Sequence, residues 1–119
     1  MPRQPATLAG LRNALRRFAA ARDWEQFHTP KNLAMALAVE AAELLEQFQW
    51  LTPAQSAQLN VRKKRAVEDE IADVLLYLTR LADVLDVDPI AAACRKIRSN
   101  ARKYPVSRAK GNARKYSAR

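Results

Sequence analysis

The chain has 119 residues, of which 49% are hydrophobic, two are glycine and six are proline. This composition favours one compact helical domain, residues 1–119, over a disordered chain. The net charge of +9, from 21 basic and 12 acidic residues, makes a nucleic-acid partner one alternative to consider.

The charges are unevenly distributed along the chain. Residues 105–119 contain five basic residues and no acid, whereas at least six of the acids lie in two short central stretches. An acidic centre with a basic periphery fits an anionic ligand that is held through a metal ion and flanking cations.

No run of 18 apolar residues is present, so we expect no membrane span, and the N-terminus lacks the apolar core of a signal peptide. The one cysteine, Cys94, excludes an intrachain disulfide framework and fits a reducing compartment. We expect Cys94 to be a small buried side chain and the protein to be cytoplasmic.

The first two helices have clear start signals. Thr7 is a suitable N-cap, and apolar residues at helical spacing predict a helix that ends near Arg22. Residues 23–28 have no clear periodicity and are expected to form a loop. Thr29 followed by a proline predicts the start of a second helix, which we expect to run to about Trp50 or Leu51.

Caps of the same kind precede the remaining elements. Thr52 with the following proline predicts a short helix that reaches about residue 59, and Asn60 can cap a third helix over about 62–85. Asp88 with the next proline begins a fourth helix, which Pro105 ends. Residues 105–119 are expected to be an extended basic arm.

The third helix is apolar around almost all of its circumference, which is typical of a helix that is covered on all sides. It can be the central helix of a monomeric bundle. In a chain of this size, we consider an interface between subunits the better explanation.

Each of the two central helices has a pair of acids on its apolar side. Glu40 lies in one stripe with leucines of the second helix, with Glu43 along its edge, and Glu70 and Asp73 share an apolar face of the third helix. A bare buried carboxylate is costly, so these acids must be paired, protonated or bound to a cation. Four oxygen donors without Cys or His suit a hard cation, Mg²⁺ or Mn²⁺. The alternative is that the acids are solvated or neutralised by Arg80 or a nearby lysine.

Two ordered stretches, EAAELLEQFQW and EDEIADVLLYL, resemble the MazG-like all-α nucleotide pyrophosphohydrolases. RDWEQFHTPKNL upstream, and KYP and ARKYS downstream, are most similar to the dCTP pyrophosphatase branch. The resemblance spans about residues 8–117. It implies a four-helix MazG-like fold, assembled as a tetramer (a dimer of dimers), with a dimer as second choice.

The resemblance also implies an activity: hydrolysis of a nucleoside triphosphate between its α and β phosphates, giving a monophosphate and pyrophosphate. It implies that Mg²⁺, with Mn²⁺ as a substitute, is bound by Glu40, Glu43, Glu70 and Asp73. Glu43 and Glu46 are the catalytic candidates, because Glu46 lies one turn further and can orient or deprotonate the attacking water; the alternative is that Glu46 is a solvated acid.

The implied substrate-binding residues are aromatic or basic: Trp24, Phe27, His28, Trp50, Tyr77, Arg114 and Lys115. Each of the aromatic residues can instead be a core residue, although Trp50 and Tyr77 share the face of their helices' acids. Leu15 occupies the place of a histidine in the animal dCTP-preferring enzymes, so the preference for cytosine is left open. Two rival interpretations are a basic nucleic-acid-binding module that uses residues 62–65 and the tail, and a catalytically silent protein of the same fold.

Overall fold

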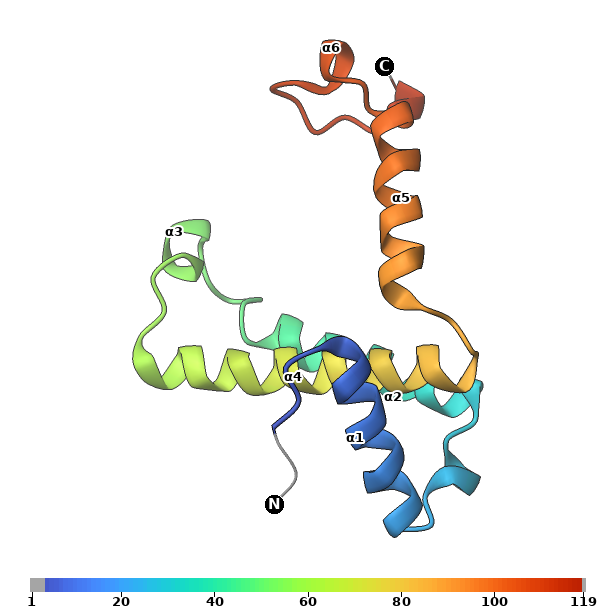
Figure 1. Ribbon diagram of the computed structural model, residues 1–119. Helices are drawn as coiled ribbons and strands as arrows, with labels where there is room; N and C mark the ends of the chain where they lie inside the picture. The colour runs from blue at the N-terminus through green and yellow to red at the C-terminus, as the bar shows by residue number, and fades with distance from the viewer. Residues whose placement is uncertain (1–3, 119) are drawn as a thin grey trace. The chain divides into compact units, whose positions relative to one another are not determined.

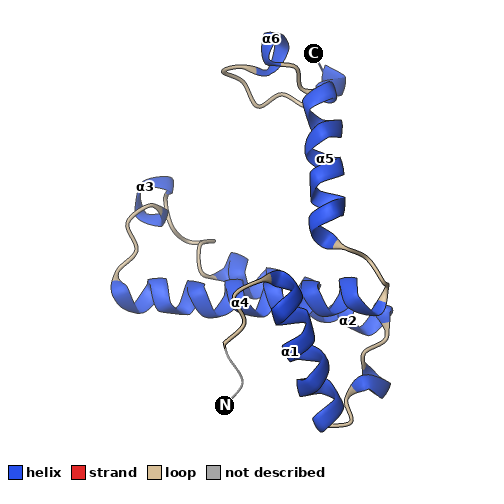
Figure 2. Cartoon of the chain, in the orientation of Figure 1, coloured by secondary structure: helices blue, strands red, loops and turns tan. Residues whose placement is uncertain are grey.

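The computed structural model describes residues 4–118, which fall into two compact units divided between Asp86 and Val87. Every regular element within this range is helical, as the sequence predicts (Figure 2). None of its helices is long and apolar enough to cross a membrane. The assignment of the whole chain to one domain stays a prediction.

The main helices begin at the capping residues that the sequence predicts. They are α1 (Leu8–Ala21), α2 (Pro30–Glu46), α4 (Val61–Val84) and α5 (Pro89–Lys103). Their N-cap side chains accept hydrogen bonds from backbone N–H groups of the first turn, and these caps are Thr7, Thr29, Asn60 and Asp88. Since the first N–H groups of a helix have no partner within it, these caps decide where each helix starts.

The chain reverses direction at the end of α1. Asp23 has a left-handed φ of 52°, and the N–H groups of Asp23 and Trp24 donate to the carbonyls of Ala20 and Ala19 at 3.2 and 3.0 Å. This pair of bonds is a Schellman ending, which reverses the chain. Trp24 is thereby turned back onto the helix, where its ring lies 5.6 Å from that of Phe18.

The expectation that the second helix continues to Trp50 or Leu51 is wrong, because α2 ends at Glu46. The N–H groups of Gln47 and Phe48 donate to carbonyls three residues back instead of four. These tighter bonds unwind the helix into successive turns. Trp50 therefore does not share a helical face with Glu40 and Glu43.

The first unit is built on the pair α2 and α4, which lie side by side and run in opposite directions (Figure 1). The turns after α2 and the short helix α3 (Pro53–Ser56) make this reversal, and α1 packs on α4. The buried apolar core is small: Ala19, Leu33, Val67 and Ala82. The α2–α4 pair therefore supplies the frame on which side chains of both helices meet.

One apolar stripe of α4 is left uncovered by α1 and α2. Ile71, Leu75 and Leu78 recur at i, i+4 and i+7 and are 52%, 42% and 44% exposed. The apolar circumference expected for this helix therefore includes one face that neither α1 nor α2 covers.

The second unit consists of α5, the short helix α6 (Val106–Ala109) and a 3₁₀ turn, η2 (Tyr116–Ala118). Tyr104 and Tyr116 meet edge to face at 5.9 Å, which brings the last residues onto the end of α5. Two short helical turns therefore interrupt the segment that is expected to be extended. Cys94 is exposed, so the expectation that it is a buried side chain is wrong.

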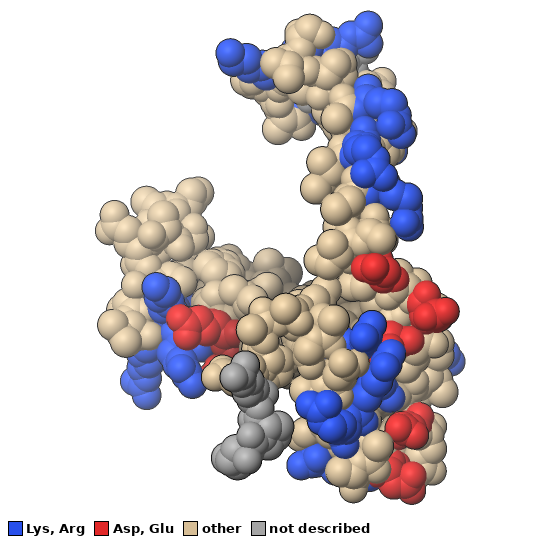
Figure 3. Space-filling model, in the orientation of Figure 1, with Lys and Arg blue, Asp and Glu red and all other residues tan. Residues whose placement is uncertain are grey.

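The whole net charge belongs to the second unit. Residues 87–119 contain ten of the 21 basic residues and one of the 12 acids, so the remainder of the chain is neutral. Lys and Arg side chains line α5 in Figure 3. The basic periphery that the sequence predicts is thus concentrated in one unit.

Candidate functional site

Three carboxylates meet where α2 lies against α4. Glu40 and Glu43 come from α2 and Glu70 from α4, and one oxygen of each lies within 4.8 Å of the others. The i, i+3 spacing puts the two α2 acids on the side that faces α4. We call these three residues the carboxylate cluster.

The cluster contains two buried oxygens without a partner. Oε2 of Glu40 and Oε2 of Glu70 accept no hydrogen bond from any described residue. Burial, followed by the neighbouring Glu43 carboxyl, raises the pKa of Glu40 to about 7. Burial and Glu43 raise the pKa of Glu70 as well. The protein alone thus leaves this site short of positive charge.

Asp73 lies outside the group of three but close to it. Its charge contributes to the raised pKa values of Glu40 and Glu70. Glu46 is exposed at the last position of α2 and does not belong to the cluster. The structure therefore brings three of the four predicted metal ligands together, with the fourth beside them.

The lysines and arginines between residues 4 and 118 form no ion pair with these acids. Among the described residues, the ion pairs are Arg16–Asp83, Arg80–Asp83, Arg65–Glu68 and Arg65–Asp69. Arg80, which the alternative interpretation assigns to the acids, pairs with Asp83 instead. A structural network of salt bridges is therefore not what holds the carboxylate cluster.

A pocket of about 160 Å³ lies beside the cluster, between α1, the loop before α2, and α4. Its lining residues are Leu15, Phe18, Ala19, Trp24, His28, Asp73, Leu76, Tyr77 and Arg80. Trp24 meets Phe18 and His28 edge to face, at 5.6 and 6.3 Å. Asp73 lines the pocket and also acts on the cluster, so the two features are continuous along α4.

Some of the predicted binding residues lie elsewhere. Phe27 and Trp50 are 58% and 87% exposed and do not line this pocket. Arg114 and Lys115 belong to the second unit. Trp24, His28 and Tyr77 are thus the predicted residues that the structure brings to the pocket, and the roles of the others stay predictions.

Arg80 is the pocket residue whose importance the sequence understates. At i+7 from Asp73 and i+3 from Tyr77, it lies on the same face of α4. That spacing is a usable signal, but an arginine is rarely buried without a partner. Its partners, Asp83 and His28, become evident only in the folded chain.

Comparison with known proteins shows the family to which this chain belongs. The family model of the MazG-like family matches residues 35–118. The chain belongs to the MazG-like family. It is 42% identical over 113 residues to dCTP pyrophosphatase 1 from Homo sapiens, and 43% identical over 114 residues to the Bos taurus protein of that name. These alignments cover 93% of this chain, which spans 66% and 67% of the two relatives.

A solved structure is also similar to this MazG-like chain. The crystal structure of a pyrophosphatase from Archaeoglobus fulgidus superposes with a TM-score of 0.79 at 44% identity. The match covers 88% of this chain and 98% of the archaeal one. The resemblance to the MazG-like family that the sequence motifs indicate is thus confirmed.

The carboxylate cluster of this MazG-like chain fits a divalent cation. Two of its oxygens are buried without a donor, and all its ligand atoms are carboxylate oxygens. Hard cations such as Mg²⁺ and Mn²⁺ prefer such donors, whereas Zn²⁺ sites usually include Cys or His. A bound cation would supply the positive charge that the described side chains lack.

Proposed function

We propose that this MazG-like chain is a nucleoside triphosphate pyrophosphohydrolase. It cleaves the bond between the α and β phosphates of dCTP or modified pyrimidine deoxynucleotides, giving the monophosphate and pyrophosphate, and so removes unwanted nucleotides from the pool. The observation that carries the proposal is the continuity of an unneutralised carboxylate cluster with an aromatic pocket through Asp73. The relatives named dCTP pyrophosphatase 1 support the nucleotide substrate.

Each part of the substrate has a matching part of the site. The pocket accepts the base, with Trp24 and Tyr77 as aromatic surfaces for stacking. Glu40, Glu43 and Glu70 hold Mg²⁺ or Mn²⁺, with Asp73 next to them. A bound divalent cation supplies neutralisation of the phosphate oxygens and activation of water.

The attacking water needs a group that orients it or accepts its proton. Glu43 belongs to the cluster, and Glu46 lies one turn further along α2 at its exposed end. A carboxylate at either position can orient a water molecule or accept a proton from it. We assign this role to one of these two residues.

We further propose that the chain acts as a homo-oligomer, a tetramer or a dimer. The exposed stripe of Ile71, Leu75 and Leu78 supports a partner surface, since a contiguous apolar face is unusual on a monomer.

A second function is favoured by one observation, the concentration of the entire +9 charge in residues 87–119. A nucleic-acid-binding module would use this charge and bind duplex DNA in a salt-sensitive manner. It would leave the partnerless oxygens of Glu40 and Glu70 without a role, and for that reason we favour the hydrolase.

One experiment decides between these functions. The protein is incubated with each deoxynucleoside triphosphate and Mg²⁺, and the products are separated by anion-exchange chromatography. We expect dCMP and pyrophosphate from dCTP. Release of orthophosphate would contradict the assigned bond, and no hydrolysis together with salt-sensitive binding to a labelled DNA duplex would favour the rival.

A further inference from the structure

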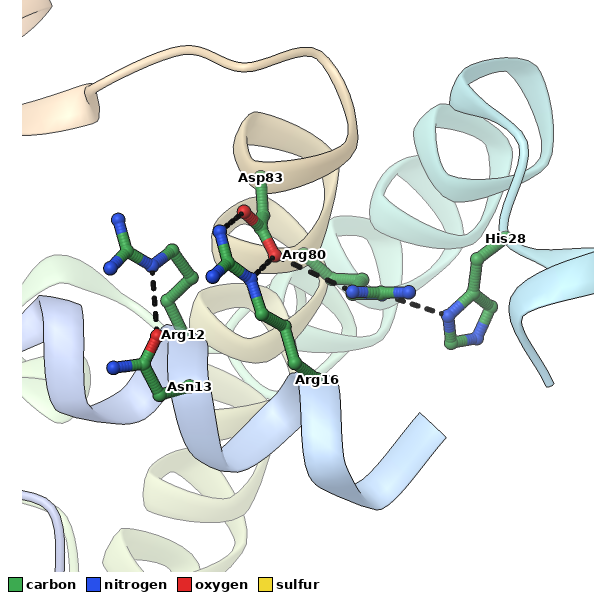
Figure 4. Close-up of polar contacts among 6 residues, drawn as sticks. All are labelled: Arg12, Asn13, Arg16, His28, Arg80 and Asp83. Carbon is green, nitrogen blue, oxygen red and sulfur yellow. Dashed lines mark hydrogen bonds and ion pairs between the residues drawn. The ribbon is translucent and has the colours of Figure 1, made fainter. Parts of the chain in front are cut away.

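Four polar side chains form a continuous series of contacts beside the pocket (Figure 4). Arg16 of α1 donates through Nε to an oxygen of Asp83 at 2.7 Å, and Arg80 Nη1 lies 3.5 Å from the same oxygen. Arg80 then donates its Nε–H to Nδ1 of His28 at 3.0 Å. Arg80 is only 9% exposed, so these partners, rather than bulk water, orient its guanidinium.

This geometry fixes the proton of His28. A guanidinium carries donors and no acceptor, and it stays protonated in proteins. Nδ1 of His28 must therefore present its lone pair to Arg80, and the ring proton must be on Nε2. A charged imidazolium would direct an N–H against the N–H of Arg80, so the contact also keeps the ring neutral.

The electrostatic surroundings of His28 agree with a neutral ring. Burial, and then the charge of Arg80, lower the pKa of His28, and the carboxylate of Glu25 opposes them. Asp73 and Tyr77 are the other ionisable groups that line the same pocket.

The fixed tautomer determines what one end of the pocket offers to a ligand. With Nδ1 engaged by Arg80, the one polar atom that His28 has left is the Nε2–H donor. Arg80 itself has only donors, and Leu15 and Leu76 of the same lining have no hydrogen-bonding side chain. His28 and Arg80 therefore present donors and no acceptor to the pocket, whereas the side-chain acceptors of the lining are the Asp73 carboxylate and the Tyr77 hydroxyl.

We infer that Arg80 is a positioning residue that holds His28 as an Nε2–H donor, and that this pair selects a base edge with hydrogen-bond acceptors. The adjacent O2 and N3 of cytosine form such an edge. The inference rests on the proposed function, because it takes a nucleobase as the ligand of the pocket. Asp83 and Arg16 support the pair by holding the guanidinium in place.

The first test needs no turnover, because His28 is the only histidine of the chain. Long-range ¹H–¹⁵N correlation spectra of protein labelled with ¹⁵N-histidine, at pH 7.5, report this one ring. We expect the Nε2–H tautomer in the wild type and a mixture of tautomers in Arg80→Leu. The matched control, Arg65→Leu, removes an arginine from the exposed surface of the same helix and should leave the spectrum unchanged. A wild-type Nδ1–H tautomer or imidazolium, or an unchanged spectrum in Arg80→Leu, would overturn the inference.

The second test separates donation to the base from a structural role. A glutamine at this position can accept from Arg80 through Oε1 and donate through Nε2, whereas leucine can do neither. We expect His28→Leu and Arg80→Leu to raise KM for dCTP about tenfold, the usual effect of one hydrogen bond, with kcat changed less than about threefold. His28→Gln should recover most of the loss. If His28→Gln is as impaired as His28→Leu, selection through the donor is wrong.

The two tests distinguish failure of the inference from failure of the proposed function. If no nucleotide is hydrolysed, the proposed function fails, whereas the spectra still decide whether Arg80 fixes the ring. If dCTP is hydrolysed and Arg80→Leu changes neither the spectrum nor KM, the inference fails and the function stands. Should Arg80→Leu not fold, the wild-type spectrum and the two His28 variants provide the decision.

Discussion

Arg16 and Asp83, which are 67 residues apart in the sequence, form a two-point ion pair that joins α1 to α4. The pair lies next to the pocket, because Leu15, which precedes Arg16, and Arg80, one turn before Asp83, both line it. The wall of the pocket thus depends on a contact between residues that are far apart in the sequence. The geometry of the pocket should be sensitive to the loss of this contact.

Removal of the Asp83 carboxylate should destabilise the protein. Asp83→Ala leaves the buried Arg80 without its anionic partner, which we expect to lower the free energy of unfolding by about 3 kcal/mol. The side chain of Asp83 is 9% exposed, whereas that of Asp69, paired with Arg65 on the same helix, is 66% exposed. Asp69→Ala is therefore the matched control, with an expected loss below about 1 kcal/mol. Urea denaturation measures both, and equal losses would show that Asp83 has no special role.

The same pair predicts a pH dependence with a definite sign. Hydrogen bonding to Arg16 lowers the pKa of Asp83 below its ordinary 3.8. A carboxyl with a lowered folded pKa contributes stability that is present above the unfolded pKa and is lost as pH falls through the folded pKa. The difference between wild type and Asp83→Ala should be constant above about pH 5 and shrink below 3.8. A difference that does not change between pH 7 and 2.5 would contradict this.

The aromatic wall of the pocket makes a prediction about substrate binding. Trp24→Ala removes a stacking surface, so KM for pyrimidine deoxynucleotides should rise roughly tenfold. Trp24→Phe keeps an aromatic face and should recover most of the affinity. Steady-state kinetics with dCTP, together with a melting curve for each variant, provides the measurement. Unchanged kinetics in Trp24→Ala would show that Trp24 is a structural aromatic residue and does not bind the base.

The starts of the helices could be predicted from the sequence because their determinants are local. Thr7, Thr29, Asn60 and Asp88 each act within one turn. The end of α2 could not, because no glycine or proline lies between Glu46 and Pro53 and the apolar period continues through Trp50. After Glu46 the backbone N–H groups of Gln47 and Phe48 bond three residues back, and no glycine or proline in this stretch signals the change.

The site could be predicted only in part for a similar reason. The acid pairs are visible because Glu40 and Glu70 interrupt apolar faces, and the structure brings them together. The burial of Arg80 depends on Asp83 and on His28, which is 52 residues away. Helical spacing gives the face of a residue, but it does not show which distant partner makes a buried charge tolerable.

The exposed stripe of α4 predicts the effect of a charge on assembly. Leu75→Glu places a carboxylate in the centre of the stripe, so it should dissociate an oligomer while the helix content is retained. Lys64→Glu introduces an acid on the same helix at an exposed polar position and should leave the assembly intact. Light scattering at micromolar concentration measures the mass, and circular dichroism measures the helix. A wild-type mass of 13.4 kDa would contradict the oligomer itself.

The carboxylate cluster makes a final prediction, which separates a metal site from a structural network. Without metal, burial and neighbouring carboxylates raise the pKa of Glu40 to about 7, above its ordinary 4.5. A carboxyl with a raised folded pKa holds its proton more tightly in the folded state. The metal-free protein should therefore gain stability from this group as pH falls from about 7 to 4.5. The lowered pKa of His28 makes the folded protein less stable as pH falls below 6.5. This contribution is the same in wild type and variant, so it cancels when the two are compared at one pH.

Glu43→Gln removes one negative charge from the cluster while it keeps the shape of the side chain. In EDTA at pH 7.5 this variant should melt a few degrees above the wild type, and the difference should shrink toward pH 4.5, because Glu40, with its pKa raised to about 7, takes up its proton over this range. Mg²⁺ should raise the melting temperature of the wild type by mass action and that of the variant less, while the variant loses turnover. A structural salt-bridge network predicts the reverse, since loss of one member leaves a buried cation unpaired. A variant that melts below the wild type in EDTA and responds equally to Mg²⁺ would therefore exclude a metal site at this cluster.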